Sequence, residues 1–316
     1  MLLGKVGERI IKLDTITVNF VDFWCNFIKE DNYFYNLLST KFKVVIDEIT
    51  PDIVFYSVDY DKKNEKQKYL GTKSKLVYYT GESTLPNWDE CDLAFTFDYN
   101  SVHQKNYRLP LWSLYFNLFN RPYNLNRDHA YLHNLEDFLS KKIDKRKHLS
   151  EKTNFCNFVY SQASGKRVDF FPKLVNRSKR QIISAGRLYN NVGWNISGRS
   201  DHIEKIQFLS KFKFTISFEN RDYLGYTTEK IIHPMFANSI PIYWGNNNVG
   251  ITDFNPKSFI NAKNYSSDEE LIDYINFLDS NLEEYFNILN QSWFINNKIP
   301  EFVLPENVLK RIENIL

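Results

Sequence analysis

The chain has 316 residues. A single hydrophobic core usually stops growing at about 250–300 residues, so this length favours two domains. Its hydrophobic fraction of 43% and charged fraction of 25% are the balance of an ordinary globular protein. A formal net charge of +2 is too weak to indicate a nucleic-acid-binding protein, although it permits a local basic site for an anionic ligand.

The three cysteines, Cys25, Cys91 and Cys156, are far apart and odd in number, so they indicate neither a disulfide framework nor a zinc site. This use of cysteine favours a reducing compartment, and we expect a cytoplasmic protein. The sequence has no apolar stretch of 18 residues and no long apolar run at its start. We therefore expect neither a membrane span nor a signal peptide, and any membrane contact would be peripheral.

The first half alternates short apolar runs with a helical pattern. Strands are predicted at 16–20, 43–46, 53–58, 75–80 and 93–97, and a helix at 32–38. Strands that alternate with helices indicate parallel βαβ units and a doubly wound sheet. Helices on both faces of such a sheet explain why the strands are almost continuously apolar.

A polar and partly helical connector over 121–154 separates this half from a second alternation. We place the domain boundary near residue 150, which gives an N-terminal domain 1–150 and a C-terminal domain 151–316. Further strands are predicted at 155–160, 181–184, 213–218, 240–244 and 258–261, and helices at 167–176, 201–209, after Gly225, 267–278 and 281–289. Ligands of open α/β sheets bind beyond the carboxyl ends of the strands, so a site in the cleft between two such domains is expected.

A polar segment follows the predicted strand 213–218 and leads into a helix. Gly225 permits a turn, and the pair Thr227 and Thr228 opens a helix, where Thr suits the N-cap position. A helix N-terminus offers free N–H donors to a phosphate. Lys230 is unfavourable for the dipole of this helix unless an anion lies nearby. The alternative is an ordinary helix start in which Glu229 matches the dipole and Lys230 is solvated.

Four segments around this helix start resemble, in order and spacing, the signature of the alpha-1,3/1,4-fucosyltransferases, glycosyltransferase family 10. They cover 211–220, 225–231, 240–245 and 254–260. Weaker similarity to the bacterial members covers 19–24, 79–86 and 107–111. The resemblance implies a GT-B fold, in which two Rossmann-like domains face each other across a cleft. The N-terminal domain would bind the acceptor and the C-terminal domain GDP-fucose, and the last helix could pack back on the N-terminal domain.

The resemblance also implies an activity, namely transfer of L-fucose from GDP-fucose with inversion. The acceptor would be a glycan of N-acetyllactosamine or lactose type, and the attacking group O3 of its GlcNAc. Glu82 stands where the bacterial members have their proposed general base, although Ser83 follows it where those members usually have Asn. The alternative role for Glu82 is structural, as a cap of the loop after strand 75–80.

The remaining site residues are assigned to the donor by the same resemblance. Arg167 and Lys230 are similar to the residues that contact the donor pyrophosphate, and Tyr226 to a tyrosine beside the phosphates. Asn220 is similar to an asparagine of the same site, and Glu229 to the glutamate that binds the ribose.

No metal site and no cofactor are predicted, because GT-B enzymes of this kind place the phosphates on basic residues. A divalent ion could still stimulate transfer. The Asp-Tyr-Asp triplet at 59–61 resembles a metal-binding DxD motif, but it lies in a polar turn of the first domain. Two other functions stay open: a GT-B glycosyltransferase for a different nucleotide sugar, and a nucleotide- or glycan-binding protein without catalysis.

Overall fold

The computed structural model describes residues 14–25, 27–59, 62–119, 133–196 and 202–316. The chain divides into two compact units, which are described separately. The first unit takes the residues up to Tyr79 together with Pro86–Ala94 and Leu309–Leu316. The second unit takes Thr80–Leu85 and Phe95–Val308. This division follows packing alone, and the domain boundary at residue 150 stays a prediction.

The first sheet has the strand order β2-β1-β3-β4-β5-β6. Its strands are β1 (Thr15–Val21), β2 (Lys43–Ile46), β3 (Ile53–Tyr56), β4 (Lys75–Tyr79), β5 (Leu93–Thr96) and β6 (Asn106–Arg108). β1 pairs in parallel with both β2 and β3, so that Val18 lies opposite Ile46 on one side and Ile53 on the other. The five strands predicted in this half are confirmed, with small shifts at their ends, and β6 was not predicted.

Aromatic rings fill the core of the first unit. Phe20 of β1 stacks on Phe55 of β3 with the ring centroids 5.1 Å apart. Phe34, from helix α1 (Tyr33–Leu38), stacks on the same Phe55 ring at 4.8 Å. All four residues of β3 are buried, as expected for a strand with both faces covered. The high aromatic content of the chain therefore serves its core.

The second sheet has the order β10-β9-β11-β12-β13, and all its neighbouring pairs are parallel. Its strands are β9 (Asn154–Asn157), β10 (Ile182–Ile183), β11 (Phe212–Phe218), β12 (Ile240–Trp244) and β13 (Ile260–Asn261). Phe214 in the central strand β11 lies opposite Cys156 on one side and Ile240 on the other. The doubly wound arrangement predicted for this half is confirmed.

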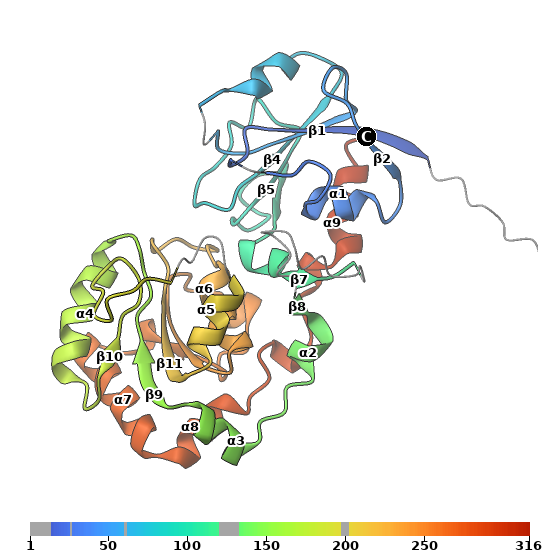
Figure 1. Cartoon of the computed structure of the whole chain (residues 1–316). Coiled ribbons are helices and arrows are strands. Elements are labelled where there is room, and N and C mark those ends of the chain that lie inside the picture. Colours follow the sequence, from blue (N-terminus) through green and yellow to red (C-terminus); the bar gives the residue numbers. More distant parts are fainter. Residues whose placement is uncertain (1–13, 26, 60–61, 120–132, 197–201) are drawn as a thin grey trace, which may run out of the picture. The chain divides into compact units, whose positions relative to one another are not determined.

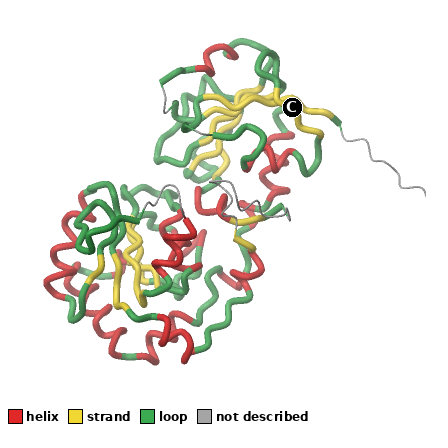
Figure 2. The backbone as a smooth tube through the Cα atoms, in the orientation of Figure 1, coloured by secondary structure: helices red, strands yellow, loops and turns green. Residues whose placement is uncertain are grey.

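Helices cover both faces of the second sheet (Figures 1 and 2). They are α4 (Gly165–Arg177), α5 (His202–Leu209), α6 (Glu229–Phe236), α7 (Asp268–Ser280) and α8 (Leu282–Leu289). α5 and α6 pack on each other and on β11, whereas α4 packs on α7. Pro234 lies inside α6, which is only eight residues long. Asn238, in the left-handed region with φ 49°, follows the end of this helix, as predicted.

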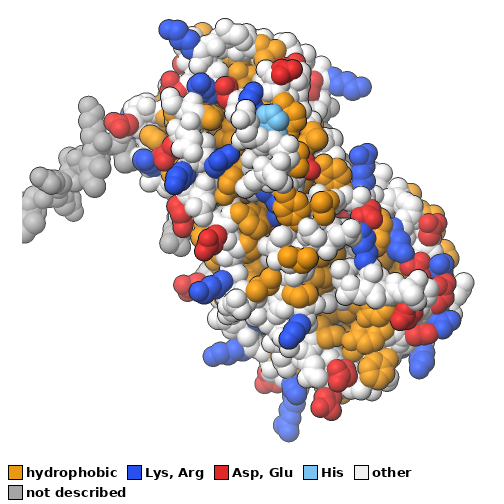
Figure 3. All heavy atoms as spheres, turned by 180° about the vertical axis from the view of Figure 1, so that it is seen from behind, with side chains coloured by type: hydrophobic (Ala, Val, Ile, Leu, Met, Phe, Trp, Pro, Cys, Tyr) orange, Lys and Arg blue, Asp and Glu red, His pale blue; other side chains and the backbone are white. Residues whose placement is uncertain are grey.

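The remaining elements are short or lie near the ends of the units. They are β7 (Phe116–Asn117), β8 (His133–Asn134), α2 (Leu135–Leu139), α3 (Lys145–Glu151) and α9 (Pro305–Glu313). α2 and α3 confirm the partly helical character of the connector within its described residues. The end of α9 belongs to the first unit, where Glu313 forms an ion pair with Lys41. Charged side chains of both signs are interspersed over the face in Figure 3, which matches the small net charge.

Candidate functional site

A polar loop of the second unit joins the carboxyl end of β11 to the N-terminus of α6. The helix begins at Glu229, and the side chain of its N-cap, Thr228, accepts a hydrogen bond from the N–H of Lys230. Gly225 lies in the loop with φ +88°, and a Cβ at this position would stand 2.3 Å from the Phe97 carbonyl oxygen. Only glycine fits both constraints. The predicted turn and the predicted helix start are confirmed.

A fully buried carboxylate, Glu219, organises this helix start. Its Oε1 accepts a hydrogen bond of 2.8 Å from the Thr228 N–H, and the Thr228 hydroxyl lies 2.8 Å from its Oε2. The Lys230 ammonium lies 3.4 Å from Glu219 Oε2 and 3.2 Å from Glu229 Oε1, and it donates to the Thr228 hydroxyl at 2.9 Å. Two carboxylates therefore hold a lysine in the first turn of a helix, where its charge opposes the dipole.

Burial and charge determine the protonation of these groups. Burial raises the pKa of the Glu219 carboxyl, and Lys230 opposes that effect only in part. Burial would also raise the pKa of Glu229, but Lys230, Lys205 and His233 outweigh it and hold that pKa well below its usual range. Although burial acts to lower the pKa of Lys230, Glu229 and Glu219 raise it above its usual value. Lys230 is therefore a fixed cation and Glu229 a fixed anion at neutral pH.

Arg167, in the first turn of α4, brings a second cation to the same end of the sheet. Its side chain is buried, and its Nη2 and Nε donate to the Phe218 carbonyl oxygen at 2.7 and 3.2 Å. The guanidinium carbon lies 4.1 Å from the ring centroid of Tyr160, a geometry that suits a cation–π contact. Arg167 is also within electrostatic range of Lys230. The structure therefore brings these two predicted donor residues into one charged cluster.

Tyr226 lies within electrostatic range of both this cluster and Glu82. The tyrosine is buried, and its ring meets that of Phe97 edge-on with the centroids 4.6 Å apart. Burial raises the pKa of its hydroxyl well above the usual range, and the charges of Glu219 and Glu82 add to this effect. The Tyr226 hydroxyl is therefore a permanent hydrogen-bond donor, and Glu82 lies near enough to act on it electrostatically.

A buried ion pair fixes the turn that carries Tyr226. Arg108 of β6 forms two hydrogen bonds of 2.7 and 2.8 Å with the Asp253 carboxylate, and both side chains are almost fully buried. The same guanidinium donates to the carbonyl oxygens of Gly225 at 2.9 Å and Phe97 at 3.2 Å. Two charges buried this deeply are tolerated because their hydrogen bonds are satisfied. Arg108 thereby holds the loop before α6 in position.

Glu82 lies in a loop that its own backbone and neighbouring threonines stabilise. Its N–H donates to the Thr80 hydroxyl at 2.9 Å, and its carbonyl oxygen accepts from the Thr84 N–H at 2.8 Å. Within the described residues, the Glu82 carboxylate itself takes part in no hydrogen bond or ion pair. The half-buried carboxylate therefore does not cap the loop.

Asn220 differs from the other predicted donor residues, since its side chain is exposed directly after Glu219.

Sequence reasoning missed the roles of Glu219, Lys205 and Arg108 in this region. An acidic residue at the carboxyl end of a buried strand is a signal that could have indicated Glu219. Nothing in the sequence pattern indicates that Lys205 or Arg108 belongs to the same region.

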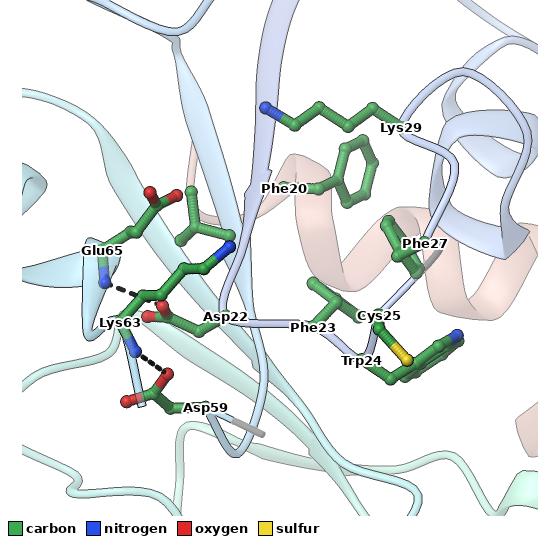
Figure 4. Close-up of a pocket in the computed structure, with 11 residues that line it drawn as sticks. Phe20, Asp22, Phe23, Trp24, Cys25, Phe27, Lys29, Asp59, Lys63 and Glu65 are labelled. Carbon is green, nitrogen blue, oxygen red and sulfur yellow. Dashed lines mark hydrogen bonds between the residues drawn. The ribbon is translucent and has the colours of Figure 1, made fainter. Parts of the chain in front are cut away.

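A hollow of about 200 Å³ lies at the carboxyl end of β1 within the first unit (Figure 4). Its lining is an aromatic group with charged residues opposite: Phe20, Phe23, Trp24, Phe27, Lys29, Asp22, Asp59, Lys63 and Glu65. The Asp22 carboxylate accepts hydrogen bonds from the N–H groups of Glu65 and Lys66 at 2.7 and 3.0 Å. Aromatic faces beside polar groups are the surface that a sugar ring prefers.

The triplet at 59–61 lies only in part within the described residues. The Asp59 carboxylate accepts hydrogen bonds from the N–H groups of Lys63 and Asn64, and the other two residues lie outside the described part. Across the residues that the structure describes, no group of three or more His, Cys, Asp or Glu side chains could hold a metal ion. In the same part of the chain, no helix combines the length and apolar character needed to cross a bilayer.

Known proteins match both halves of the chain. The sequence model of the alpha-(1,3)-fucosyltransferase FucT N-terminal domain matches residues 18–115. The model of the C-terminal part of glycosyltransferase family 10 (fucosyltransferase) matches residues 149–301. The two matched segments together cover well over half of the chain, and the second contains Arg167, Glu219 and Lys230.

Individual relatives agree with the domain matches. Alpha-(1,3)-fucosyltransferase FucT of Helicobacter pylori is 30% identical over 84% of this chain and 57% of its own length. Alpha-(1,3)-fucosyltransferase B of Drosophila melanogaster is 32% identical over 34% of this chain and 24% of its own length. The chain therefore spans about half of the first relative and a quarter of the second.

Solved structures share the fold. The crystal structure of an alpha1,3-fucosyltransferase superposes with a TM-score of 0.74 at 24% identity, covering 99% of this chain and 93% of that one. Anabaena HepE, solved in complex with UDP-glucose, superposes with a TM-score of 0.54 at 9% identity, covering 95% of this chain and all of that one. These matches confirm the predicted GT-B fold class. With both domain matches and the shared fold, the chain belongs to glycosyltransferase family 10, the fucosyltransferase family.

Proposed function

We propose that this chain transfers L-fucose from GDP-fucose to a hydroxyl of a glycan acceptor. The observation that carries the proposal is the cation cluster at the carboxyl end of β11, where Arg167 and Lys230 lie beside the N-terminus of α6. Fixed cations and free helix N–H groups are what a nucleoside diphosphate requires. GDP-fucose is the donor because the chain belongs to the fucosyltransferase family, and a related alpha1,3-fucosyltransferase was solved with GDP-fucose.

Each donor residue has a role that fits its environment. Arg167 and Lys230 neutralise the diphosphate and stabilise the charge that develops on the departing GDP. The protonated hydroxyl of Tyr226 donates to a phosphate oxygen. The ionised carboxylate of Glu229 accepts hydrogen bonds from the ribose hydroxyls, and the exposed Asn220 contacts the donor from the loop.

Glu82 acts as the general base in this proposal. Its carboxylate takes the proton of the acceptor hydroxyl as that oxygen attacks C1 of fucose. The bond between C1 and the β-phosphate oxygen breaks, its electron pair leaves with GDP, and the configuration at C1 inverts. The absence of a capping role for this carboxylate among the described residues supports the assignment.

The acceptor is proposed to be a glycan of N-acetyllactosamine or lactose type, attacked through O3 of its GlcNAc or glucose residue. The hollow of the first unit, with its aromatic face and its charged edge, supports a saccharide acceptor. We also propose a cytoplasmic protein with at most peripheral membrane contact. Its cysteines Cys25, Cys91 and Cys156 are free thiols, the state that a reducing compartment maintains.

The direct test is a transfer assay with GDP-fucose and a panel of acceptors, namely N-acetyllactosamine, lactose and type 1 chains, followed by linkage analysis of the product. Product with an alpha-1,3 linkage supports the proposal. No transfer to any of these acceptors, together with tight binding of another nucleotide sugar, would refute it.

A thermal-shift screen separates the alternatives on the donor side. GDP-fucose should raise the unfolding temperature more than GDP-mannose or UDP-glucose, because a ligand stabilises the folded state in proportion to its affinity. A larger shift with UDP-glucose would instead indicate a glycosyltransferase with another donor. A protein that binds GDP-fucose but shows no turnover with any acceptor would be a binding protein.

A further inference from the structure

Helix α5 lies beside α6, the helix whose N-terminus forms the candidate donor site (Figure 1). Near its carboxyl end, Phe208 and Leu209 are buried in an apolar cluster with Ala237, which directly follows α6. Lys205 stands three and four residues before these two anchors. Residues with this spacing share one face of a helix, so Lys205 lies on the face that packs against the unit.

Lys205 is half-buried, whereas Ile203, Glu204 and Gln207 of the same helix are exposed. Its ammonium is within electrostatic range of Glu229, Lys230 and other charges of the donor cluster. It forms no hydrogen bond and no ion pair within 4 Å to any residue that the structure describes. Burial lowers the pKa of this lysine; Glu229 opposes that effect, whereas Lys230 and Arg167 add to it. A cation in such a place is costly unless an anion joins it.

The charges of the cluster do not balance within the described residues. Lys230 faces both nearby carboxylates, Glu219 and Glu229. Arg167 donates to backbone carbonyl oxygens rather than to a carboxylate. Three cations thus meet two carboxylates, and Glu219 is the weaker anion because burial raises its pKa. The excess positive charge suits an anionic ligand group such as a diphosphate.

We propose that Lys205 is a third cationic contact of the donor diphosphate, together with Arg167 and Lys230. This proposal rests on the proposed function, since it assigns a further binding residue to the same donor. When the donor is bound, the negatively charged phosphate oxygens attract Lys205 and offset its repulsion by Lys230 and Arg167. Lys205 lies outside the four signature segments, on helix α5, which neighbours α6.

The test measures GDP and guanosine affinity by calorimetry for the wild type, Lys205→Met, Lys205→Arg and Lys211→Met. Loss of a hydrogen bond to a charged group costs roughly 10- to 100-fold in affinity. We expect Lys205→Met to weaken GDP by that factor and to leave guanosine unchanged, whereas Lys205→Arg should stay close to the wild type. Lys211 is an exposed lysine two residues beyond the end of α5, and its replacement is the matched control, expected to change neither affinity.

Thermal unfolding of the free protein distinguishes ligand binding from a structural role. Lys205→Met removes a half-buried charge that has no hydrogen bond or ion pair among the described residues, so the variant should unfold close to the wild-type temperature or above it. Wild-type affinity for GDP in Lys205→Met, or an equal loss of guanosine affinity, would overturn this inference alone. A wild-type protein that does not bind GDP at all would overturn the proposed function and this inference with it.

Discussion

Glu82 and Glu219 are two carboxylates of the second unit in opposite situations. Glu219 is fully buried and hydrogen-bonded to Thr228, whereas Glu82 is half-buried and its carboxylate has no partner among the described residues. A catalytic base and a positioning residue differ in this way, because the base must stay available to the substrate. The proposed base and the carboxylate at the helix start therefore support separate predictions.

For Glu82→Gln, we expect transfer to fall by roughly 10²- to 10⁴-fold, the usual contribution of a general base. GDP affinity should not change, and the free energy of unfolding should stay within about 0.5 kcal/mol of the wild type, as for substitutions outside hydrogen-bonded networks. Initial rates with GDP-fucose, GDP titration and urea unfolding measure the three quantities. Transfer above a tenth of the wild-type rate would remove Glu82 from the role of base.

For Glu219→Ala, the expected result is a loss of stability. The substitution leaves the Thr228 N–H without its acceptor and removes one of the two carboxylates beside Lys230. Breaking a buried charged network in this way costs about 3 kcal/mol, whereas Glu219→Gln keeps an acceptor for the N–H and should cost less. Urea unfolding is the measurement, and GDP affinity should fall in parallel because Lys230 loses its position.

The matched control is Glu151→Ala, at an exposed glutamate whose ion pair with Lys147 spans 3.8 Å. Such a surface pair contributes only about 0.5 kcal/mol. If Glu219→Ala were no more destabilising than this control, Glu219 would not organise the helix start.

At the scale of elements, helix α3 is tied to α8 by a histidine that burial keeps neutral. His148 is 5% exposed, and its Nε2 shares a hydrogen bond of 2.8 Å with the Tyr285 hydroxyl. Burial lowers the pKa of His148 to about 4, and the positive charges of Lys152, Lys213 and Lys141 add to the effect. In the unfolded chain the same imidazole has a pKa of about 6.5.

This difference makes the stability of the second unit depend on pH. Between pH 6.5 and pH 4 the unfolded state binds a proton that the folded state does not, so stability falls as pH is lowered through this window. A pKa difference of one between the folded and unfolded states corresponds to about 1.4 kcal/mol. His148 should therefore lower the free energy of unfolding by about 2 kcal/mol between pH 7 and pH 4.5. The measurement is urea unfolding at both pH values.

His148→Gln keeps a hydrogen-bonding group beside Tyr285 but does not titrate. Its stability should therefore fall less than that of the wild type over the same pH range, although the carboxylates of both proteins titrate alike. Equal losses in the two proteins would show that His148 does not bind its proton more weakly when the chain is folded.

For the whole molecule, the sequence predicts the two parallel sheets because continuous apolar runs such as 53–56 and 240–244 leave only one way to bury both faces. β6 is three residues long and polar at both ends, so it carries no periodic signal. The placement of Lys230 and Thr228 at a helix start is predictable because residues close together in the sequence determine where a helix begins. The ion pair of Arg108 with Asp253 and the electrostatic interaction of Lys205 with Glu229 are not, since they join residues far apart in the chain.

The charge distribution of the whole chain bears on the last prediction, the effect of metal removal. A net charge of +2 leaves no general field to attract a nucleotide, so the donor must be held by local cations. In the proposed complex, Arg167 and Lys230, joined by Lys205, supply positive charge where GDP acquires its negative charge. We therefore expect transfer to continue in EDTA within about threefold of the untreated rate, equivalent to a change in the activation free energy of less than about 0.7 kcal/mol.

An essential metal ion stabilises the charge of a transition state by several kcal/mol, so its removal would slow transfer by roughly 100-fold or more. A loss of that size, restored by Mg²⁺ or Mn²⁺, would show that the three cations do not suffice, whereas a small stimulation by added metal is compatible with them.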